Sequence, residues 1–469
     1  MLPRQIVEYL ESHRDSHMSS LFDFLRIPSI ANVQDTPDSC QRAAAWLADY
    51  LTKLGFEAKI MPVAGGEHDR PNVVATAVAG DDKPTLLIYG HYDVQPPDPL
   101  DQWLSPPFEP TIRDGQLFCR GVSDDKGQLF TNITAVEAWM KTSGLPVNIK
   151  ILAEGQEEVG SPHLEPWIAA NAALLKADAA LIGDSGWFAE DLPSIIYALR
   201  GIAYFELTVK GPSVDIHSGT HGGAVANPVN ALARIIAAMH DKYGKVAIPG
   251  FYDEVLRLTP AERRAWRKLP FDEAEYAKSL GVPALGGGER RLGLMERRWA
   301  RPTLDCNGIF GGYSGPGSKT IIPAQAGAKF SIRLVSNQDP AKIVAAVKQF
   351  VADHTPPGVT AEVDVHTANR PVIVATDSPA MAAARAAVKE AFGKPPAMVR
   401  CGASVPVAEL VKRILGIDGV LLGHALPGDN CHSPNERMKL GQLHNGAVAT
   451  AAFMQNLAEH LKPAARSQP

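Results

Sequence analysis

The chain has 469 residues, of which 45% are hydrophobic and 21% charged, so it has the composition of a globular protein too long for one ordinary core. Its 46 basic and 51 acidic residues give a formal charge of −5, which offers no electrostatic case for nucleic-acid binding. No apolar run approaches the roughly 20 residues of a membrane helix, and the five cysteines lack the spacing of a disulfide framework. Because the first residues also lack the apolar core of an export signal, we expect a cytoplasmic protein with no membrane partner.

Helical and strand patterns alternate over the first 199 residues. Residues 4–26 are expected to form one or two amphipathic helices, and residues 42–54 another. Ser161 and Pro162 have the residue types of an N-cap and a first helical position. Apolar runs predict strands at about 57–62, 72–78, 85–89, 148–153 and 179–182, with a helix over 127–140 between the third and the fourth. Such alternation predicts an α/β fold whose mixed or parallel sheet is covered by helices on both faces.

The pattern changes near residue 200. Strands are expected at about 204–210, 305–311, 326–335 and 359–366, and helices at 228–240 and 340–354. Without the charged insertion 245–304, which includes a helical pattern over Glu289–Arg301, the order is β-α-β-β-α-β, a ferredoxin-like unit. We therefore expect a second domain, residues 200–370, inserted into a first domain made of 1–199 and 371–469. The first domain resumes with a helix after Ser378 and ends with one over 440–461.

Three predicted strands of the first domain are followed by residues that bind metals. The residues after the strands at 85–89, 148–153 and 179–182 are, respectively, His91 and Asp93, Glu157 and Glu158, and Asp184. Because the carboxyl ends of parallel strands meet at one sheet edge, these side chains are expected to converge. Asp124 joins them from the loop before a helix, and His432 is the best candidate for a second imidazole.

Each of these features alone has a plainer explanation. A His and an Asp two positions apart are most often a surface pair, Glu157 and Glu158 a solvated pair, and His432 before Ser-Pro a helix N-terminus. Their convergence at one sheet edge favours a metal site. Two imidazoles with several carboxylates suit two divalent ions of the zinc, manganese or cobalt type.

The order of these motifs resembles that of the dinuclear zinc amidohydrolases, which include carnosinase-like dipeptidases, aminoacylases, carboxypeptidase G and succinyl-diaminopimelate desuccinylase. The segments that carry the resemblance are His91-x-Asp93, Arg120-Gly-x-x-Asp124-Asp-Lys-Gly, Glu157-Glu158-x-Gly-Ser, Asp184 and His432-Ser-Pro-Asn-Glu. Supporting segments surround His217, Thr320, Arg333 and Ser404. The match spans nearly the whole chain and is closest to the cytosolic non-specific dipeptidases and carnosinases. It implies a mixed-sheet zinc-peptidase catalytic domain with an inserted ferredoxin-like lid and dimerisation domain.

The resemblance also implies which residues bind the two metal ions of each subunit. Asp124 is expected to bridge both ions, and its peptide bond to Asp125 is expected to be cis. The remaining ligands are expected to be His91 and Asp184 for one ion and Glu158 and His432 for the other. Zinc is the first expectation, with manganese and cobalt as alternatives. One departure from the family pattern is Cys431, which stands where the family usually has Ala; it is expected to be a small buried residue, with metal coordination or oxidation of the thiol as the alternative.

The other site residues divide into catalytic and substrate-binding groups. The resemblance implies that Asp93 orients His91 and that Glu157 acts as general base toward a water shared by the two ions. In the resembling dipeptidases the equivalent of His217 comes from the other subunit, so the resemblance implies a homodimer in which His217 stabilises the oxyanion in its partner's site. The expected substrate-binding residues are Arg333, for a free carboxylate, and its hydrogen-bonding partners Thr320 and Ser404. Without the resemblance, His217 would be read as a turn histidine and Arg333 as a surface ion-pair residue.

We therefore expect a metallopeptidase that hydrolyses small unblocked dipeptides. The alternative is an N-acyl amino acid amidohydrolase of the aminoacylase, desuccinylase or carbamoylase type, because the metal motifs do not separate these activities. A non-catalytic relative is disfavoured, since it would be expected to lose Glu157 or a metal ligand and all of them are present.

Overall fold

The computed structural model describes residues 1–32, 37–63 and 69–461, and it divides into two compact units. The first unit comprises Met1–Tyr197, Val374–Val399 and Val405–Pro469, and the second comprises Ala198–Ile373 and Arg400–Ser404. The sequence places these boundaries at residues 200 and 370, and it does not anticipate that 400–404 belong to the second unit. Within the described residues, every helix is too short or too polar to span a lipid bilayer.

A mixed sheet forms the centre of the first unit, with its strands in the order β1-β2-β6-β3-β7-β17-β8 and β16 beside β8. In chain order these strands are β1 (Glu57–Met61), β2 (Asn72–Ala77), β3 (Thr85–His91), β6 (Asn148–Glu154), β7 (Ala179–Ile182), β8 (Ser194–Leu199), β16 (Ala397–Arg400) and β17 (Gly419–Leu421). Strand β3 lies parallel to both β6 and β7. Six of its seven residues are buried, which explains its uninterrupted apolar sequence.

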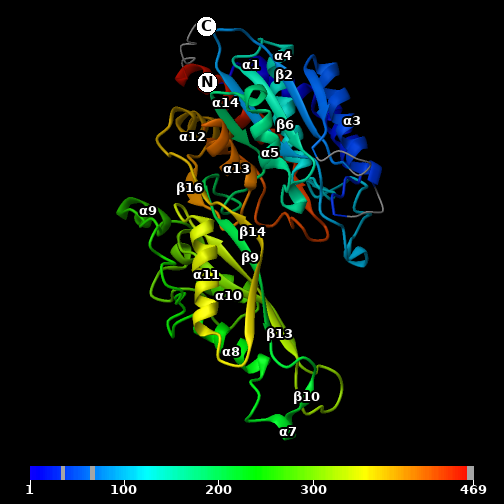
Figure 1. The fold of residues 1–469 in the computed structure, drawn as a ribbon. Helices are drawn as coiled ribbons and strands as arrows, with labels where there is room; N and C mark the ends of the chain where they lie inside the picture. The colour runs from blue at the N-terminus through cyan, green and yellow to red at the C-terminus, as the bar shows by residue number, and fades with distance from the viewer. Residues whose placement is uncertain (33–36, 64–68, 462–469) are drawn as a thin grey trace. The chain divides into compact units, whose positions relative to one another are not determined.

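Helices cover this sheet. They are α1 (Arg4–Ser12), α2 (Arg14–Leu25), α3 (Pro37–Leu54), α4 (Lys126–Lys141), α5 (Leu164–Ala170), α6 (Ala172–Leu175), α12 (Pro379–Phe392), α13 (Pro406–Leu410) and α14 (Leu440–His460). Helix α3 packs on β1 and β2, and Figure 1 shows it at one edge of the unit. Helix α14 contacts both α4 and α12. A small sheet of β4 (Thr111–Arg113), β5 (Gln116–Phe118) and β18 (Arg437–Lys439) completes the unit.

One predicted helix start in this unit is wrong. Helix α5 begins at Leu164, not after Ser161. The N–H of Ser161 donates to the carbonyl of Gln156 (2.9 Å), and Ser161 has a φ of +52°. Ser161 therefore closes the preceding turn, Glu157–Val159, instead of capping the helix.

The second unit contains a four-stranded antiparallel sheet with the strand order β11-β13-β9-β14. Its main elements are β9 (Gly201–Lys210), α8 (Pro228–Ala238), β11 (Thr303–Gly311), β13 (Gln325–Leu334), α11 (Pro340–His354) and β14 (Thr360–Asn369). This is the β-α-β-β-α-β order that the sequence predicts. Helices α8 and α11 pack on the sheet and on each other, and Figure 1 shows α11 lying along β14 and β9. Phe205 and Phe330 stack in the core, with ring centroids 5.0 Å apart.

Smaller elements lie between these strands and helices. The insertion contains α9 (Pro260–Trp266) and α10 (Glu273–Ser279). The helix predicted over Glu289–Arg301 is present only after Gly293, where residues 294–295 are α-helical and a π-helical turn, Glu296–Ala300, follows them directly. Glycine has low helix propensity, so Gly293 marks the start of the helical stretch and residues 289–292 stay outside it. After β9, the strand β10 (Ile216–His217) and helix α7 (Ser218–His221) pack against β12 (Ile321–Ile322).

Candidate metal centre and substrate-binding residues

Three strands of the first unit end at the same edge of the sheet, as predicted. The register pairs His91 of β3 with Glu154 of β6, and Tyr89 of β3 with Ile182 of β7. The residues that directly follow β6 and β7 therefore emerge beside His91. This alignment brings the ligand-type side chains of the three segments together, although they lie almost 100 residues apart in the chain.

The ligand-type side chains form two groups that share Asp124. One group is His91, Asp124 and Asp184, the other is Asp124, Glu158 and His432, and the ligand atoms within each group lie within 4.8 Å of one another. The two oxygens of Asp124 face different imidazoles, with Oδ1 3.0 Å from His91 Nε2 and Oδ2 2.9 Å from His432 Nε2. A carboxylate shared between two sets of oxygen and imidazole donors fits a pair of divalent ions of the zinc type.

Asp93 links His91 to the turn that carries two of the glutamates. The His91 Nδ1 atom lies 3.0 Å from the Asp93 carbonyl oxygen and 3.4 Å from its carboxylate. That carboxylate accepts the backbone N–H groups of Glu157 (3.2 Å) and Glu158 (2.9 Å). Because Asp93 is fully buried, these contacts fix the imidazole and the Glu157–Val159 turn relative to each other.

The loop that carries Asp124 is held by Glu436, a residue for which no role was predicted. The Asp124–Asp125 peptide bond is cis, as expected. The carboxylate of Glu436 is fully buried and accepts four hydrogen bonds, from Arg120 Nη1 (2.7 Å) and from the backbone N–H groups of Gly121 (2.9 Å), Ser123 (2.9 Å) and Asp124 (3.1 Å). Glu436 stands four residues after His432, so it ties two ligand-bearing segments together. Its place in the His432-Ser-Pro-Asn-Glu segment was the one sequence signal for this role.

Negative charge dominates this edge of the sheet. Burial raises the pKa of Glu157 well above its ordinary value, and burial followed by the charge of Asp124 raises the pKa of Asp184 to about 7. The hydrogen bond with Asp124 raises the pKa of His432 to about 10. Among the described residues, Glu157 alone of the clustered acids has a carboxylate without a hydrogen bond or ion pair. Cations would neutralise the excess charge and leave Glu157 free to exchange a proton.

Cys431, directly before His432, is exposed as a whole residue, contrary to the expectation of a small buried residue. Its thiol nevertheless hydrogen-bonds with Ser123, and burial raises the pKa of this thiol. The backbone explains this outcome, because His432 has a φ of +61° and the segment around it is a series of turns at the surface.

The second unit brings the predicted substrate-binding residues together in two pairs, not in one group. Arg333, near the end of β13, donates from Nη1 to the hydroxyl of Ser404 (3.1 Å). Thr320 instead lies beside His217, since the Thr320 carbonyl accepts the N–H of Ser218 (3.0 Å) and the two segments form the β10–β12 ladder. Strand β13 separates the two pairs. From its first residue, Gln325, to Arg333 there are about eight residue steps, which at the usual strand rise correspond to roughly 26 Å.

The ring of His217 has a defined hydrogen-bonding role. Its Nδ1 accepts the backbone N–H groups of Gly219 (3.0 Å) and Thr220 (3.2 Å), which caps the short helix α7. In the neutral ring the hydrogen therefore resides on Nε2, which points an N–H donor away from the turn. The same turn that suggested a structural role for His217 therefore leaves its Nε2–H available as a hydrogen-bond donor.

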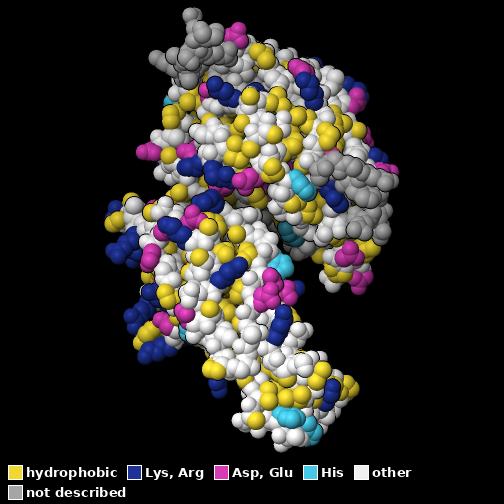
Figure 2. All heavy atoms as spheres, in the orientation of Figure 1, with side chains coloured by type: hydrophobic (Ala, Val, Ile, Leu, Met, Phe, Trp, Pro, Cys, Tyr) yellow, Lys and Arg dark blue, Asp and Glu magenta, His cyan; other side chains and the backbone are white. Residues whose placement is uncertain are grey.

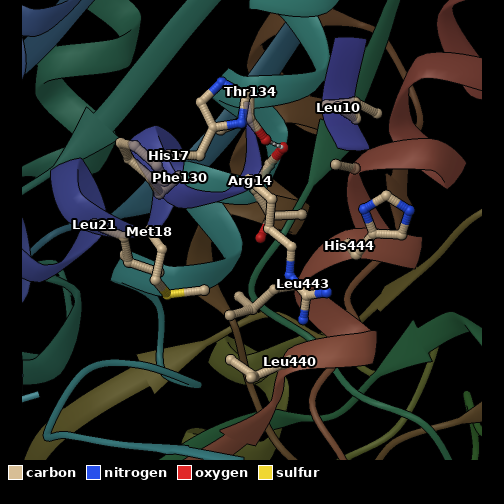
Figure 3. Close-up of a pocket in the computed structure, with 12 residues that line it drawn as sticks. Leu10, Arg14, His17, Met18, Leu21, Phe130, Thr134, Leu440, Leu443 and His444 are labelled. Atoms are coloured by element: carbon tan, nitrogen blue, oxygen red, sulfur yellow. Dashed lines mark hydrogen bonds between the residues drawn. The ribbon is translucent and has the colours of Figure 1, made fainter. Parts of the chain in front are cut away.

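A separate cavity in the first unit lies between α1, α2, α4 and α14, and Figure 3 shows the side chains that line it. Its lining is largely apolar and includes Met18, Leu21, Phe130 and Leu443. It contains none of the predicted site residues, so we do not assign it to the metal centre.

Comparison with known proteins agrees with this geometry. The family described as "Peptidase family M20/M25/M40" matches residues 87–456. The chain is 33% identical to the human Beta-Ala-His dipeptidase over 98% of this chain and 93% of that protein. Its structure resembles that of the di-peptidase Dug1p from Saccharomyces cerevisiae, with a TM-score of 0.82, 28% identity and coverage of 97% and 98% of the two chains. It also resembles the metallo-carboxypeptidase Sso-CP2 from Sulfolobus solfataricus, with a TM-score of 0.85, 34% identity and coverage of 94% and 99%. The chain therefore belongs to peptidase family M20/M25/M40.

Proposed function

We propose that this protein is a dinuclear metal-dependent dipeptidase. The observation that carries the proposal is the pair of ligand groups that share Asp124, with the unbonded carboxylate of Glu157 beside them. Two of the similar proteins, human Beta-Ala-His dipeptidase and Dug1p, are named dipeptidases, and this favours a dipeptide over an N-acyl amino acid as substrate.

In this proposal five residues hold two divalent ions, zinc in the first instance, with manganese and cobalt also fitting the donor set. The ligands are His91 and Asp184 for one ion, Glu158 and His432 for the other, and Asp124 for both. Bound ions of this kind lower the pKa of water and polarise a carbonyl oxygen.

The remaining residues of the first unit orient groups and move protons. Glu157 takes a proton from the attacking water and returns it to the leaving amine, a role that fits a carboxylate with no hydrogen bond or ion pair among the described residues. Asp93 accepts the hydrogen of His91 Nδ1 at its carbonyl oxygen and so leaves the Nε2 lone pair for a metal. Gln95 donates to Glu158 (2.7 Å) and limits the positions that this carboxylate can adopt.

We assign the substrate carboxylate to Arg333, which offers two parallel N–H groups, with Ser404 as its partner. Residues 200–370 then serve as the lid and dimerisation domain, and residues 1–199 with 371–469 as the catalytic domain. His217 and Thr320 act on the oxyanion and the substrate in the site of the other subunit. The separation of roughly 26 Å along β13 supports this assignment, because one small substrate cannot reach both pairs of one chain.

A homodimer is also supported by the surface of the second unit. Val214, Ile309, Phe310 and Tyr313 are exposed by 43–64%. Figure 2 shows hydrophobic side chains gathered with histidines at the end of the unit that carries α7 and β10. Exposed apolar side chains at one end of a domain indicate a protein interface. The five cysteines are all unpaired, which supports a reducing, cytoplasmic location.

The test is hydrolysis by purified protein loaded in turn with zinc, manganese and cobalt. Unblocked dipeptides are expected to be cleaved much faster than N-acetyl amino acids or the corresponding tetrapeptides. Fast cleavage of acylated amino acids with no cleavage of dipeptides would instead establish the amidohydrolase alternative. Stepwise release of C-terminal residues from tetrapeptides would indicate carboxypeptidase activity, the activity named for Sso-CP2.

A further inference from the structure

Arg200 is a second guanidinium beside the proposed carboxylate-binding pair of Arg333 and Ser404. It lies between β8 and β9, and the first residues of β9 pair with the last residues of β13, where Leu334 faces Gly201. Burial, and then the positive charge of Arg333, lower the pKa of Arg200 to about 10. Arg200 and Arg333 also both hydrogen-bond with Ser404, so they are neighbours, and both guanidiniums stay charged at neutral pH.

Arg200 also holds the segment that contains Ser404. Its Nε donates to the carbonyl of Gly402 (3.0 Å), its backbone N–H donates to the carbonyl of Ala403 (3.1 Å), and its carbonyl accepts the hydroxyl of Ser404 (2.6 Å). Because the Ser404 hydroxyl donates its hydrogen to the carbonyl of Arg200, its oxygen can only accept, and it accepts the Nη1–H of Arg333. One residue thus sets the direction in which the serine presents its lone pair.

The approach of Arg200 to this segment depends on a glycine. A Cβ atom on Gly402 would lie 2.9 Å from Arg200 Nη2 and 3.3 Å from the carbonyl oxygen of Arg298. A side chain at position 402 would therefore push the guanidinium out of its place. This gives a way to disturb the same contact without altering Arg200.

The charges around the two guanidiniums leave a surplus of positive charge. Among the residues that the structure describes, no carboxylate is hydrogen-bonded to or ion-paired with Arg200 or Arg333. Asp305 opposes their charge only through space, and Arg298 adds to it. Two half-buried guanidiniums without an acid partner form a site that an anion would complete.

We propose that Arg200 is a positioning and specificity-determining residue for the free carboxylate of the substrate. It fixes Ser404, which aims Arg333, and its charge makes this end of the site favour substrates that carry an anion. This inference rests on the proposed function, because it takes the substrate to be a peptide with a free C-terminus. Arg200 acts through Ser404 and Arg333, and the chemical step itself does not involve it.

The test compares one dipeptide with the same dipeptide carrying a C-terminal amide. In Arg200→Gln we expect the KM for the dipeptide to rise at least about 10-fold while kcat stays within about threefold, because ground-state binding is lost. The KM for the amide should change little, so the preference for the free acid falls. Arg200→Lys should recover part of the preference by restoring the charge, and Gly402→Ala should reproduce the loss. Arg234→Gln, an equal change of charge on the exposed side of α8, is the control.

A binding measurement separates this inference from the proposed function. Calorimetric titration of both ligands into metal-loaded Glu157→Gln protein, with and without Arg200→Gln, does not require turnover. Tighter binding of the free acid that is lost with Arg200 supports the inference, even if the wild-type protein cleaves no dipeptide. Equal losses for acid and amide, or an unchanged preference in a variant that remains folded, would overturn it.

Discussion

At the scale of single residues, Glu157 differs from the acids around it because its carboxylate makes no hydrogen bond or ion pair with any described residue. We expect Glu157→Gln to retain the metal and lose about 10²–10⁴-fold in kcat, since the amide cannot accept the proton of the water. Metal content by elemental analysis and turnover of a dipeptide check this. Glu11→Gln, the same change at an exposed position of α1, should leave both unchanged. Near-normal turnover in Glu157→Gln would remove this residue from the mechanism.

Glu436 makes a different prediction because its role is to hold the backbone of the Asp124 loop. In Glu436→Gln the amide NH₂ replaces one carboxylate oxygen, so at least one of the four groups that donate to Glu436 loses its acceptor. Arg120 also loses the negative charge of its buried partner. We expect the free energy of unfolding to fall by about 3–5 kcal/mol, the usual cost of breaking a buried pair. Urea unfolding of the metal-free protein measures it.

The matched control for this change is Glu362→Gln, because Glu362 pairs with Lys210 at the surface. An exposed pair of this kind contributes at most about 1 kcal/mol. Equal effects of the two substitutions would mean that the hydrogen bonds to the Asp124 loop contribute little. Weaker metal binding in Glu436→Gln alone is the second expected result.

At the scale of elements, the strands that carry the proposed metal ligands were predictable because they are continuous apolar runs that end in polar residues. Strand β3 and strand β7 are read directly from such runs. Strand β8, an equally apolar segment, was missed, and β17 has only three residues. The apolar run of β8 carries the same signal as β3 and β7 and could have been read from it, whereas a strand as short as β17 is below the length at which a pattern along the chain is informative.

The site shows a division between local and distant information. The ligand types at strand ends point to a metal edge, whereas the assignment of individual roles came from the resemblance. Glu436 and Arg200 were missed because their functions lie in hydrogen bonds to backbone groups that no residue pattern encodes. The grouping of Thr320 with His217 likewise follows from the β10–β12 ladder, a contact between segments about 100 residues apart.

The packing of α12 and α14 predicts a dependence of stability on pH. His424 is buried between these helices, near Phe392 and Gly446, and neither ring nitrogen has a hydrogen-bond partner in the described part of the chain. Burial lowers its pKa to about 4. Between pH 6.5 and pH 4 the unfolded chain therefore binds a proton that the folded protein does not, and stability falls as the pH falls.

We expect the wild-type protein to lose about 2 kcal/mol more than His424→Phe between pH 7 and pH 5, because the variant lacks the titrating ring. Urea unfolding of both metal-free proteins at the two pH values provides the measurement. The acids of the metal centre titrate in both proteins and cancel in the difference. Equal losses in the two proteins would show that His424 is protonated in the folded state.

At the scale of the whole molecule, the proposed dimer joins two incomplete sites. We expect Ile309→Glu to shift the protein from dimer to monomer, because it places a charge among exposed apolar side chains. Sedimentation equilibrium measures this shift. Val78→Glu introduces the same charge at an exposed valine of the first unit and should leave the dimer intact. A wild-type protein that is already monomeric and fully active would contradict the assignment of His217 to the partner's site.

The sharpest test of shared sites combines two inactive chains. His217→Ala removes the proposed oxyanion donor and is expected to cost about 10²–10³-fold in kcat, and Glu157→Gln removes the proposed base. If His217 acts in the partner's site, a heterodimer of the two variants, isolated through different affinity tags, contains one site with both residues intact. It should then recover about half of the wild-type activity, because one of the two sites of a symmetric dimer is complete. If His217 served the site of its own chain, each site of the heterodimer would lack one residue and the mixture would stay inactive.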